Sequence, residues 1–333
     1  MTNTLVLDEE QRADRFTDLV QRLSHQSVVK HFDAYADVPW DDPEYAIDPT
    51  DPRWELDGDH GLDATEWYRS QRPEVRARIG LQSIAANMKA GLQFESILKR
   101  GLLEYAFLLP DRTPEFRYAY HEVIEEAQHS LMFQEFVNRT GLDVPGLTWD
   151  LKFGARRVIG IARRFPALFF VFVLGGEDPI DHVQRTSLRS GRELHPLLER
   201  IMRIHVTEEA RHLSFARQYL RTNVPTLSAR QRHAIAIQAP LILAQMAAVM
   251  MRPPRGLVRE YSIPKEVLAE AYGPESPARD ATRESLRKVR NLLTELGLVT
   301  PPAKRLWKTF GIWEEPASRY VESGVTVESP GFE

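Results

Sequence analysis

The sequence contains two copies of a short pattern, EEAQH and EEARH, that carries a glutamate and a histidine three residues apart. The first copy provides Glu126 and His129, and the second provides Glu209 and His212. A spacing of three residues places both side chains on one face of a helix. Apolar residues surround both copies, so we expect these groups in a core, where they are costly without a compensating partner. A metal ion is the obvious partner.

A dinuclear carboxylate site in a helical bundle needs one further glutamate from each of two other helices. Residues of an antiparallel hairpin lie at the same level when they are equally far from its turn. Counted from the turn at PDRTP, Glu95 matches the level of Glu126 better than Glu104 does, and counted from the turn at GRELHP, Glu177 matches Glu209. Four glutamates with two histidines suit iron or manganese, which accept oxygen and nitrogen ligands together. They exceed what a structural zinc site uses.

Four other polar residues lie near these candidates in the sequence. His205 and Glu122 each precede a predicted ligand by one helical turn. The spacing alone favours a core histidine hydrogen-bonded to a carboxylate for His205. For Glu122 it favours a group that supports a ligand or faces solvent. Asp178 and Asp181 are candidate hydrogen-bond partners for the histidines.

Composition limits the class of protein. The chain of 333 residues has a formal charge of −4, which does not suggest a nucleic-acid partner. It has no cysteine, which excludes disulfides, thiolate zinc sites and Cys-ligated iron–sulfur clusters. The acidic N-terminus does not have the pattern of a signal peptide. Two apolar segments could be mistaken for membrane spans: FPALFFVFVLGG is too short, and AIAIQAPLILAQMAAVMM is interrupted by Gln and Pro. We interpret both as core helices and expect a cytoplasmic protein without a membrane partner.

Helical periodicity dominates the chain, and period-2 strand patterns are nearly absent. The sequence therefore predicts an all-α protein with a four-helix-bundle core and additional helices. An irregularity is expected at Gly175, Gly176 and Pro179. The expected helices span residues 12–33, 73–109, 114–141, 149–164, 166–190, 195–225, 228–251 and 276–297.

The ordered set of candidates resembles the p-aminobenzoate N-oxygenase (AurF-type) family of diiron oxygenases, over roughly residues 15–300. The residues that carry the resemblance are Glu95, Glu126-x-x-His129, Glu177 and His205-x-x-x-Glu209-x-x-His212. The extra histidine is that family's distinguishing mark, so the resemblance implies that His205 is a third histidine ligand. It also implies a ferritin-like helical bundle, two iron ions (with manganese–iron as a possible variant), O2 and a small organic substrate. An external electron donor, such as a ferredoxin or a reductase, and a homodimer are further implications.

The positions that form the substrate pocket depart from the family pattern. A tyrosine and an asparagine that help to form the pocket of the arylamine oxygenases are replaced here by Asn87 and Asp181. Asn87 would remove an aromatic wall, and Asp181 would add a negative charge that repels a substrate carboxylate. The family's carboxylate-reading arginine corresponds to either Arg287 or Arg290. The resemblance thus predicts the metal chemistry, leaves the substrate open and implies poor turnover of p-aminobenzoate.

We expect a non-haem diiron monooxygenase that N-oxygenates or hydroxylates a small organic substrate. An acyl-type desaturase or hydroxylase and an oxidase like the ribonucleotide reductase small subunit remain alternatives. A non-enzymatic helical interaction protein would not explain seven metal-type residues in register. The expected division of the chain is an N-terminal helix and irregular loop packed on the core (1–72), a ferritin-like diiron helical domain (73–300) and a C-terminal tail (301–333).

Overall fold

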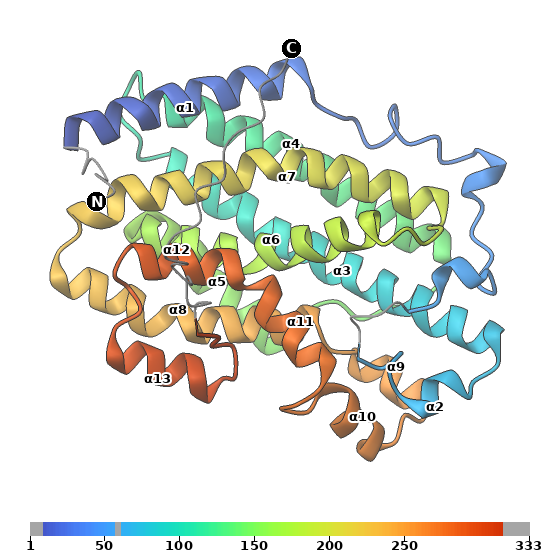
Figure 1. Ribbon diagram of the computed structural model, residues 1–333. Coiled ribbons are helices and arrows are strands. Elements are labelled where there is room, and N and C mark those ends of the chain that lie inside the picture. The colour runs from blue at the N-terminus through green and yellow to red at the C-terminus, as the bar shows by residue number, and fades with distance from the viewer. Residues whose placement is uncertain (1–8, 57–60, 316–333) are drawn as a thin grey trace, which may run out of the picture.

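The computed structural model describes residues 9–56 and 61–315 of the chain. Throughout these ranges the secondary structure is helical, without a strand, which confirms the predicted all-α class. Thirteen α-helices are formed within them, and the longest run side by side along one direction (Figure 1).

Four long helices form the core as two antiparallel hairpins. They are α3 (Pro73–Ala106), α4 (Pro114–Thr140), α6 (Pro166–Arg189) and α7 (Pro196–Asn223). Each begins with a proline, which suits the first helical turn because its missing N–H would have no partner there. Gly141 ends α4 in the left-handed region, with φ at 67°. These boundaries agree closely with the expected ones, so the register of both hairpins follows from the sequence.

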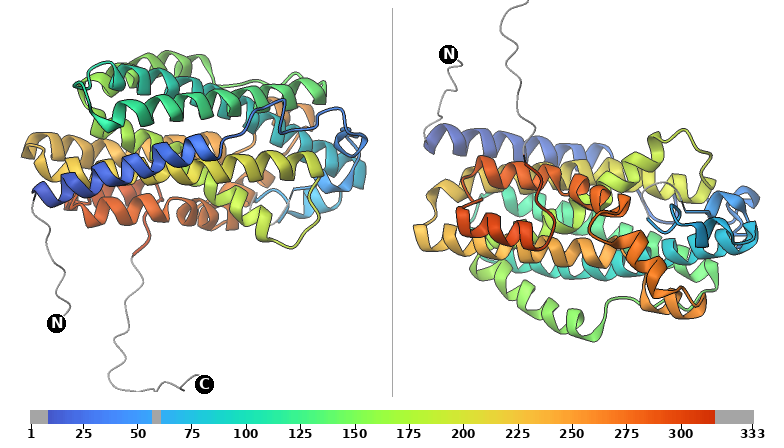
Figure 2. Two further views of the ribbon diagram at one scale, coloured as in Figure 1. Left: turned by 90° about the horizontal axis from the view of Figure 1, so that it is seen from above. Right: turned by 60° about the horizontal axis from the view of Figure 1, so that its bottom comes forward.

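The remaining helices cover this core. α1 (Glu9–Val29) packs against α4 and α7, α5 (Trp149–Arg164) against α3 and α6, and α8 (Ala229–Met250) against α6. The C-terminal helices α11 to α13 gather on one side of the bundle (Figure 2). The shorter elements are η1 (Pro43–Tyr45), η2 (Pro52–Trp54), α2 (Glu66–Arg69), η3 (Val224–Thr226), α9 (Arg255–Glu260), α10 (Lys265–Tyr272), α11 (Pro277–Ser285), α12 (Arg287–Glu295) and α13 (Pro301–Thr309).

Two details of the chain differ from the expected helices. The helix expected at 276–297 is broken at Leu286 into α11 and α12. Just before the break, the hydroxyl of Ser285 donates to the carbonyl of Thr282, a local bond that competes with helix continuation. By contrast, α6 continues through Gly175, Gly176 and Pro179 to its end, so the irregularity expected there does not interrupt the helix.

Parts of the chain outside the bundle contribute buried aromatic residues. In the segment between α1 and α3, Trp54 is fully buried, and its ring stacks on His195 with ring centroids 4.1 Å apart. In the segment expected to be a C-terminal tail, α13 buries Trp307. Residues 316–333 lie outside the described residues.

The helix α8 is long and apolar enough to cross a membrane by length and composition alone. Its most apolar window has a mean hydropathy of 1.6, and 33% of that window is buried. It packs on α6 and α13, and several of its other apolar residues line a cavity described below. Because 33% of this window is buried, our interpretation of α8 as a core helix stays a prediction.

Candidate metal centre

The seven residues predicted as metal ligands converge in the middle of the four-helix core. α3 supplies Glu95, α4 supplies Glu126 and His129, α6 supplies Glu177, and α7 supplies His205, Glu209 and His212. Each is at most 2% exposed. Glu104, the alternative to Glu95 on α3, is partly exposed and does not join the cluster. The hairpin register therefore selects Glu95.

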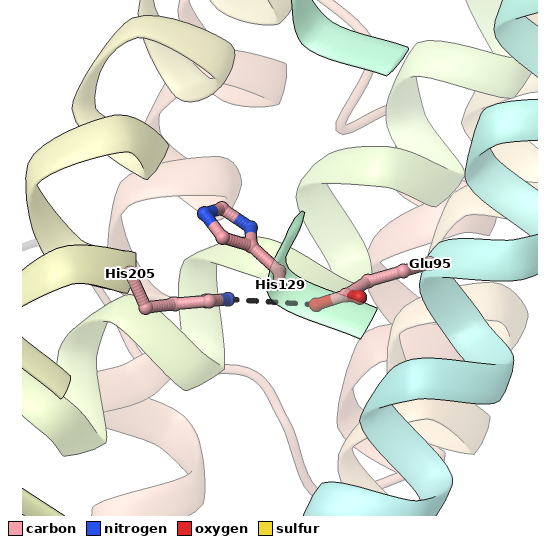
Figure 3. A group of neighbouring side chains, drawn as sticks. All are labelled: Glu95, His129 and His205. Atoms are coloured by element: carbon pink, nitrogen blue, oxygen red, sulfur yellow. Dashed lines mark ion pairs between the residues drawn. The ribbon is translucent and has the colours of Figure 1, made fainter. Parts of the chain in front are cut away.

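The ligand atoms of these residues form three overlapping groups, within each of which the atoms lie no more than 4.8 Å apart. The groups are Glu95, His129 and His205; Glu126, Glu209 and His212; and Glu177, His205 and Glu209. Among the described residues, these groups contain all seven predicted ligands and no other residue. Figure 3 shows the first group, in which His205 of α7 points toward Glu95 of α3.

Several of these buried atoms have no hydrogen-bond partner in the protein. They include both carboxylate oxygens of Glu177, one oxygen each of Glu95, Glu126 and Glu209, and Nδ1 of His129, while the other oxygen of Glu126 lies 3.0 Å from His212 Nδ1. Buried polar atoms without a partner are rare and costly in native proteins. Divalent cations would satisfy these oxygens and this nitrogen together, so the residues fit a metal centre.

The histidines are held from behind, which leaves one nitrogen of each facing the cluster. His129 Nε2 lies 2.8 Å from Glu208, and its Nδ1 faces Glu126 and Glu209 at 3.7 and 3.6 Å. His212 Nε2 lies 2.7 Å from Glu125. A carboxylate behind a histidine fixes the ring and its tautomer and makes the other nitrogen a better ligand.

Each of these supporting glutamates comes from one hairpin and contacts a histidine of the other hairpin. Glu125 of α4 supports the histidine of α7, and Glu208 of α7 supports the histidine of α4. Arg211 lies between them, 2.8 Å from Glu125 and 3.5 Å from Glu208. Sequence reasoning missed both glutamates, although the doubled Glu in each EExxH pattern was the available signal.

The third histidine is supported differently. The side-chain oxygen of Gln184, on α6, lies 2.9 Å from His205 Nδ1. His205 Nε2 faces Glu95 and Glu209, each at 3.8 Å. Since an amide oxygen can only accept, Nδ1 carries the proton and Nε2 has a free lone pair directed at the two carboxylates.

Glu95 is oriented by a short polar chain. The hydroxyl of Ser130 donates to Glu95 Oε2 at 2.8 Å, and Lys99 Nζ lies 2.5 Å from the same hydroxyl. Lys99 also donates to the backbone carbonyl of Glu126. Glu95 Oε2 is therefore occupied, while its other oxygen is turned toward His205.

The close packing of buried carboxylates in the cluster shifts the pKa values of its residues. Burial and the neighbouring Glu126 raise the pKa of Glu95 to about 8, and burial with Glu209 raises the pKa of Glu177 well above its ordinary value. Burial lowers the pKa of His129, but the nearby carboxylates of Glu126 and Glu208 outweigh this effect and raise it to about 10. Without bound cations, the cluster would therefore hold protons on these groups.

Comparison with known proteins agrees with this geometry. The sequence profile of the family described as p-aminobenzoate N-oxygenase AurF matches residues 13–297. The chain belongs to this family. An uncharacterized protein of Mycobacterium tuberculosis (strain CDC 1551 / Oshkosh) is 42% identical over 305 residues, which cover 92% of this chain and 89% of that protein. An uncharacterized protein of Mycobacterium bovis is 41% identical over 305 residues, with the same coverage of both chains. No solved structure matches the chain significantly.

The AurF family is a family of diiron oxygenases, so the recognition made from the sequence is confirmed, and the ferritin-like core is consistent with it. The relatives do not identify a substrate. The positions expected to shape the substrate pocket of this AurF-family protein can, however, be located in the structure.

Two aspartates on α6 do not support the histidines, contrary to our expectation. Asp178 forms a close ion pair with Arg217 of α7. Asp181 is paired with Arg185 at 2.6 Å and faces Lys288 at 3.4 Å. Both carboxylates are turned away from the cluster because these cations, on α6, α7 and α12, neutralise them.

The other residues expected near the ligands or the substrate have different surroundings. Glu122 is 1% exposed, so of its two expected roles the solvent-facing one is wrong and the support of a ligand stays a prediction; burial raises its pKa to about 8. Arg287 pairs with Glu284 at the surface, and Arg290 is buried against Glu314 and backbone carbonyls.

Of the four residues expected at the substrate, only Asn87 lines the large cavity beside the cluster. Asp181, Arg287 and Arg290 are not part of the cavity lining. The repulsion of a substrate carboxylate by Asp181 therefore has no support in this geometry.

Proposed function

We propose that the seven clustered residues bind two metal ions, natively iron, and that the protein is an O2-dependent monooxygenase of a small organic substrate. The observation that supports this most strongly is the set of buried carboxylate and imidazole atoms without hydrogen-bond partners, converging from four helices. Four ionised glutamates carry four negative charges, which two divalent cations would balance. Leaving such charges buried and uncompensated would cost several kcal/mol per ion.

The ligand roles follow from the orientation of each side chain. His129, His205 and His212 would each donate the nitrogen that is not held from behind. Glu126 and Glu209 lie at the centre, since both approach His129 and His212. The contacts of Glu125 with His212 and of Glu208 with His129 link the two hairpins and would hold their ligands at the same level.

When bound, a diiron centre supplies the reduction of O2, with one oxygen atom entering the substrate and the other leaving as water, at the expense of two electrons and two protons. The electrons would come from an external donor such as a ferredoxin or a reductase. The chain contributes a buried site that excludes water and holds the ligands in place. The choice between N-oxygenation and hydroxylation, the homodimer and a cytoplasmic location stay predictions.

The test is the reaction of the reduced protein with O2. The protein is loaded anaerobically with iron, reduced, freed of excess reductant and mixed with oxygenated buffer. We expect rapid uptake of one O2 per diiron centre. Glu209→Ala, which removes a central carboxylate, should show only the slow oxidation of free iron. Equal uptake by the parent and by Glu209→Ala would contradict the proposal.

A further inference from the structure

The cavity beside the cluster has a shape that bears on the substrate. Its volume is about 390 Å³, within the range of small-molecule sites. Its lining residues on α3 extend from Ile84 to Ile97, which corresponds to about 20 Å along the helix axis. On α6 they extend from Phe172 to Ser187, or about 22 Å. The cavity lining is therefore elongated, several times longer than one aromatic ring.

The lining is apolar and adaptable. Five of the seven methionines of the chain contribute to it: Met88, Met202, Met246, Met250 and Met251. Methionine side chains are flexible and fill irregular space around apolar ligands. Most of the other residues are aliphatic or aromatic, from α3, α5, α6 and α8.

The charged side chains of the lining are paired, hydrogen-bonded or exposed. Arg53 is 2.6 Å from Asp51, and Glu55 is 2.9 Å from Arg76. Arg192 donates to the carbonyl of Pro52, and Asp150 is exposed at the start of α5. Within the described lining, the inner part of the cavity consequently offers no cation for a substrate carboxylate.

The cavity lies next to the metal centre on the His205 side. Gln184 lines it and also holds His205 Nδ1, and Phe133 lines it with its ring 5.3 Å from the ring of His205. Phe94 forms a third part of this wall and packs directly on Gly176, where a side chain would collide with its ring. A long ligand in the cavity would thus have one part of its chain next to the metal centre.

We propose that this cavity binds the aliphatic chain of an extended substrate and presents the chain to the metal centre past Gln184 and Phe133. This assignment of the substrate class rests on the proposed function. The polar end of such a substrate would lie toward the part of the lining that holds Arg53 and Arg192. A single-ring aminobenzoate would leave most of the cavity unfilled.

The binding test uses metal-free protein and therefore does not depend on turnover. Equilibrium dialysis with radiolabelled alcohols from octanol to tetradecanol, and with the matching carboxylates, should show one saturable site per chain. Each added methylene should tighten binding by about 0.8 kcal/mol, or about fourfold in Kd, until the chain fills the cavity. The alcohols and carboxylates together show whether the part of the lining that holds Arg53 and Arg192 selects an anionic end. Binding without saturation, or a Kd independent of chain length, would overturn the proposal.

A pair of variants on α5 locates the binding. Gly154 lines the cavity, and a Cβ added there meets no atom within 4 Å, so Gly154→Phe should fold and place a ring inside the cavity. Gly160, on the same helix but outside the lining, has similar room, with only Arg164 at 3.5 Å. We expect at least a tenfold loss of dodecanol binding in Gly154→Phe and no change in Gly160→Phe. Equal effects of both variants would contradict the proposal.

Two further outcomes separate this inference from the proposed function. If p-aminobenzoate bound more tightly than dodecanol and was excluded by Gly154→Phe, the cavity would belong to an aromatic substrate and the inference would be wrong. If the protein bound no metal yet bound alkyl chains with the expected dependence on length, the proposed function would fail while the assignment of the cavity stood.

Discussion

The substitution Glu95→Gln should have opposite effects on the metal-free and the metal-loaded protein. Glu95 is 2% exposed, and its hydrogen bond from Ser130 can be kept by the amide oxygen of glutamine. In the metal-free protein, the change removes a buried carboxyl group that resists ionisation. In the loaded protein, it removes an anionic ligand.

The size of the first effect follows from the pKa of Glu95, which is raised to about 8 from an ordinary value of 4.5. A raised pKa means that the folded state holds a proton that the unfolded state has lost, so stability falls as pH rises from 4.5 toward 8. At pH 7 this loss spans about 2.5 pH units, or about 3 kcal/mol. Glutamine avoids the loss, which should raise the melting temperature by on the order of 5 °C.

The second effect has the opposite sign. Bound metal stabilises the folded state by about 4 kcal/mol when its concentration exceeds Kd a thousandfold. Removing one ligand weakens binding and reduces this gain. Thermal unfolding of both forms at pH 7 gives the comparison, with Glu104→Gln on the same helix as the control that should change neither form. If Glu95→Gln destabilised both forms equally, Glu95 would have a structural role and the reasoning would be refuted.

Three other predictions address the histidines and their supports. His205→Ala should retain most of its iron in elemental analysis, because six ligands remain, but lose oxygenation of substrate; parent-like activity would make His205 an ordinary core histidine. Glu208→Gln, which removes the carboxylate behind His129, should weaken metal binding by roughly 10- to 100-fold in a chelator competition, whereas Glu199→Gln in the exposed pair with Arg203 should not. The metal-free protein should lose stability between pH 7 and 9 in thermal unfolding. The raised pKa values of His129 and Glu122 mean that the folded state binds more protons than the unfolded state in this pH range. Metal-loaded protein should show a smaller loss, because metal displaces these protons; parallel pH profiles would contradict this.

Two physical rules were sufficient to predict which carboxylates and histidines of the EExxH patterns the fold brings together, while their role as metal ligands stays a prediction. Helical spacing places Glu126 with His129 on one face, and prolines at the helix starts fix the hairpin registers that bring in Glu95 and Glu177. The requirement for His205 came from the family resemblance. The structure adds only its orientation, through Gln184.

The supporting residues and the cavity were harder to predict because they depend on packing between helices far apart in the sequence. Closeness to Glu177 in the chain suggested Asp178, but one step along a helix turns a side chain by about 100°, and Asp178 meets Arg217 instead. Asp181 meets Lys288 of α12, an element whose packing the pattern did not reveal. The contacts of Glu125 with His212 and of Glu208 with His129 likewise depend on the packing of α4 beside α7.

The central claim is that the cluster holds two metal ions, and metal content tests it most directly. The protein should be loaded with iron under anaerobic conditions, freed of unbound metal and subjected to elemental analysis against protein concentration. We predict two iron ions per chain in the parent and a large loss of iron in Glu209→Ala. A parent value near zero, or a single zinc ion in a site that excludes iron, would contradict the account.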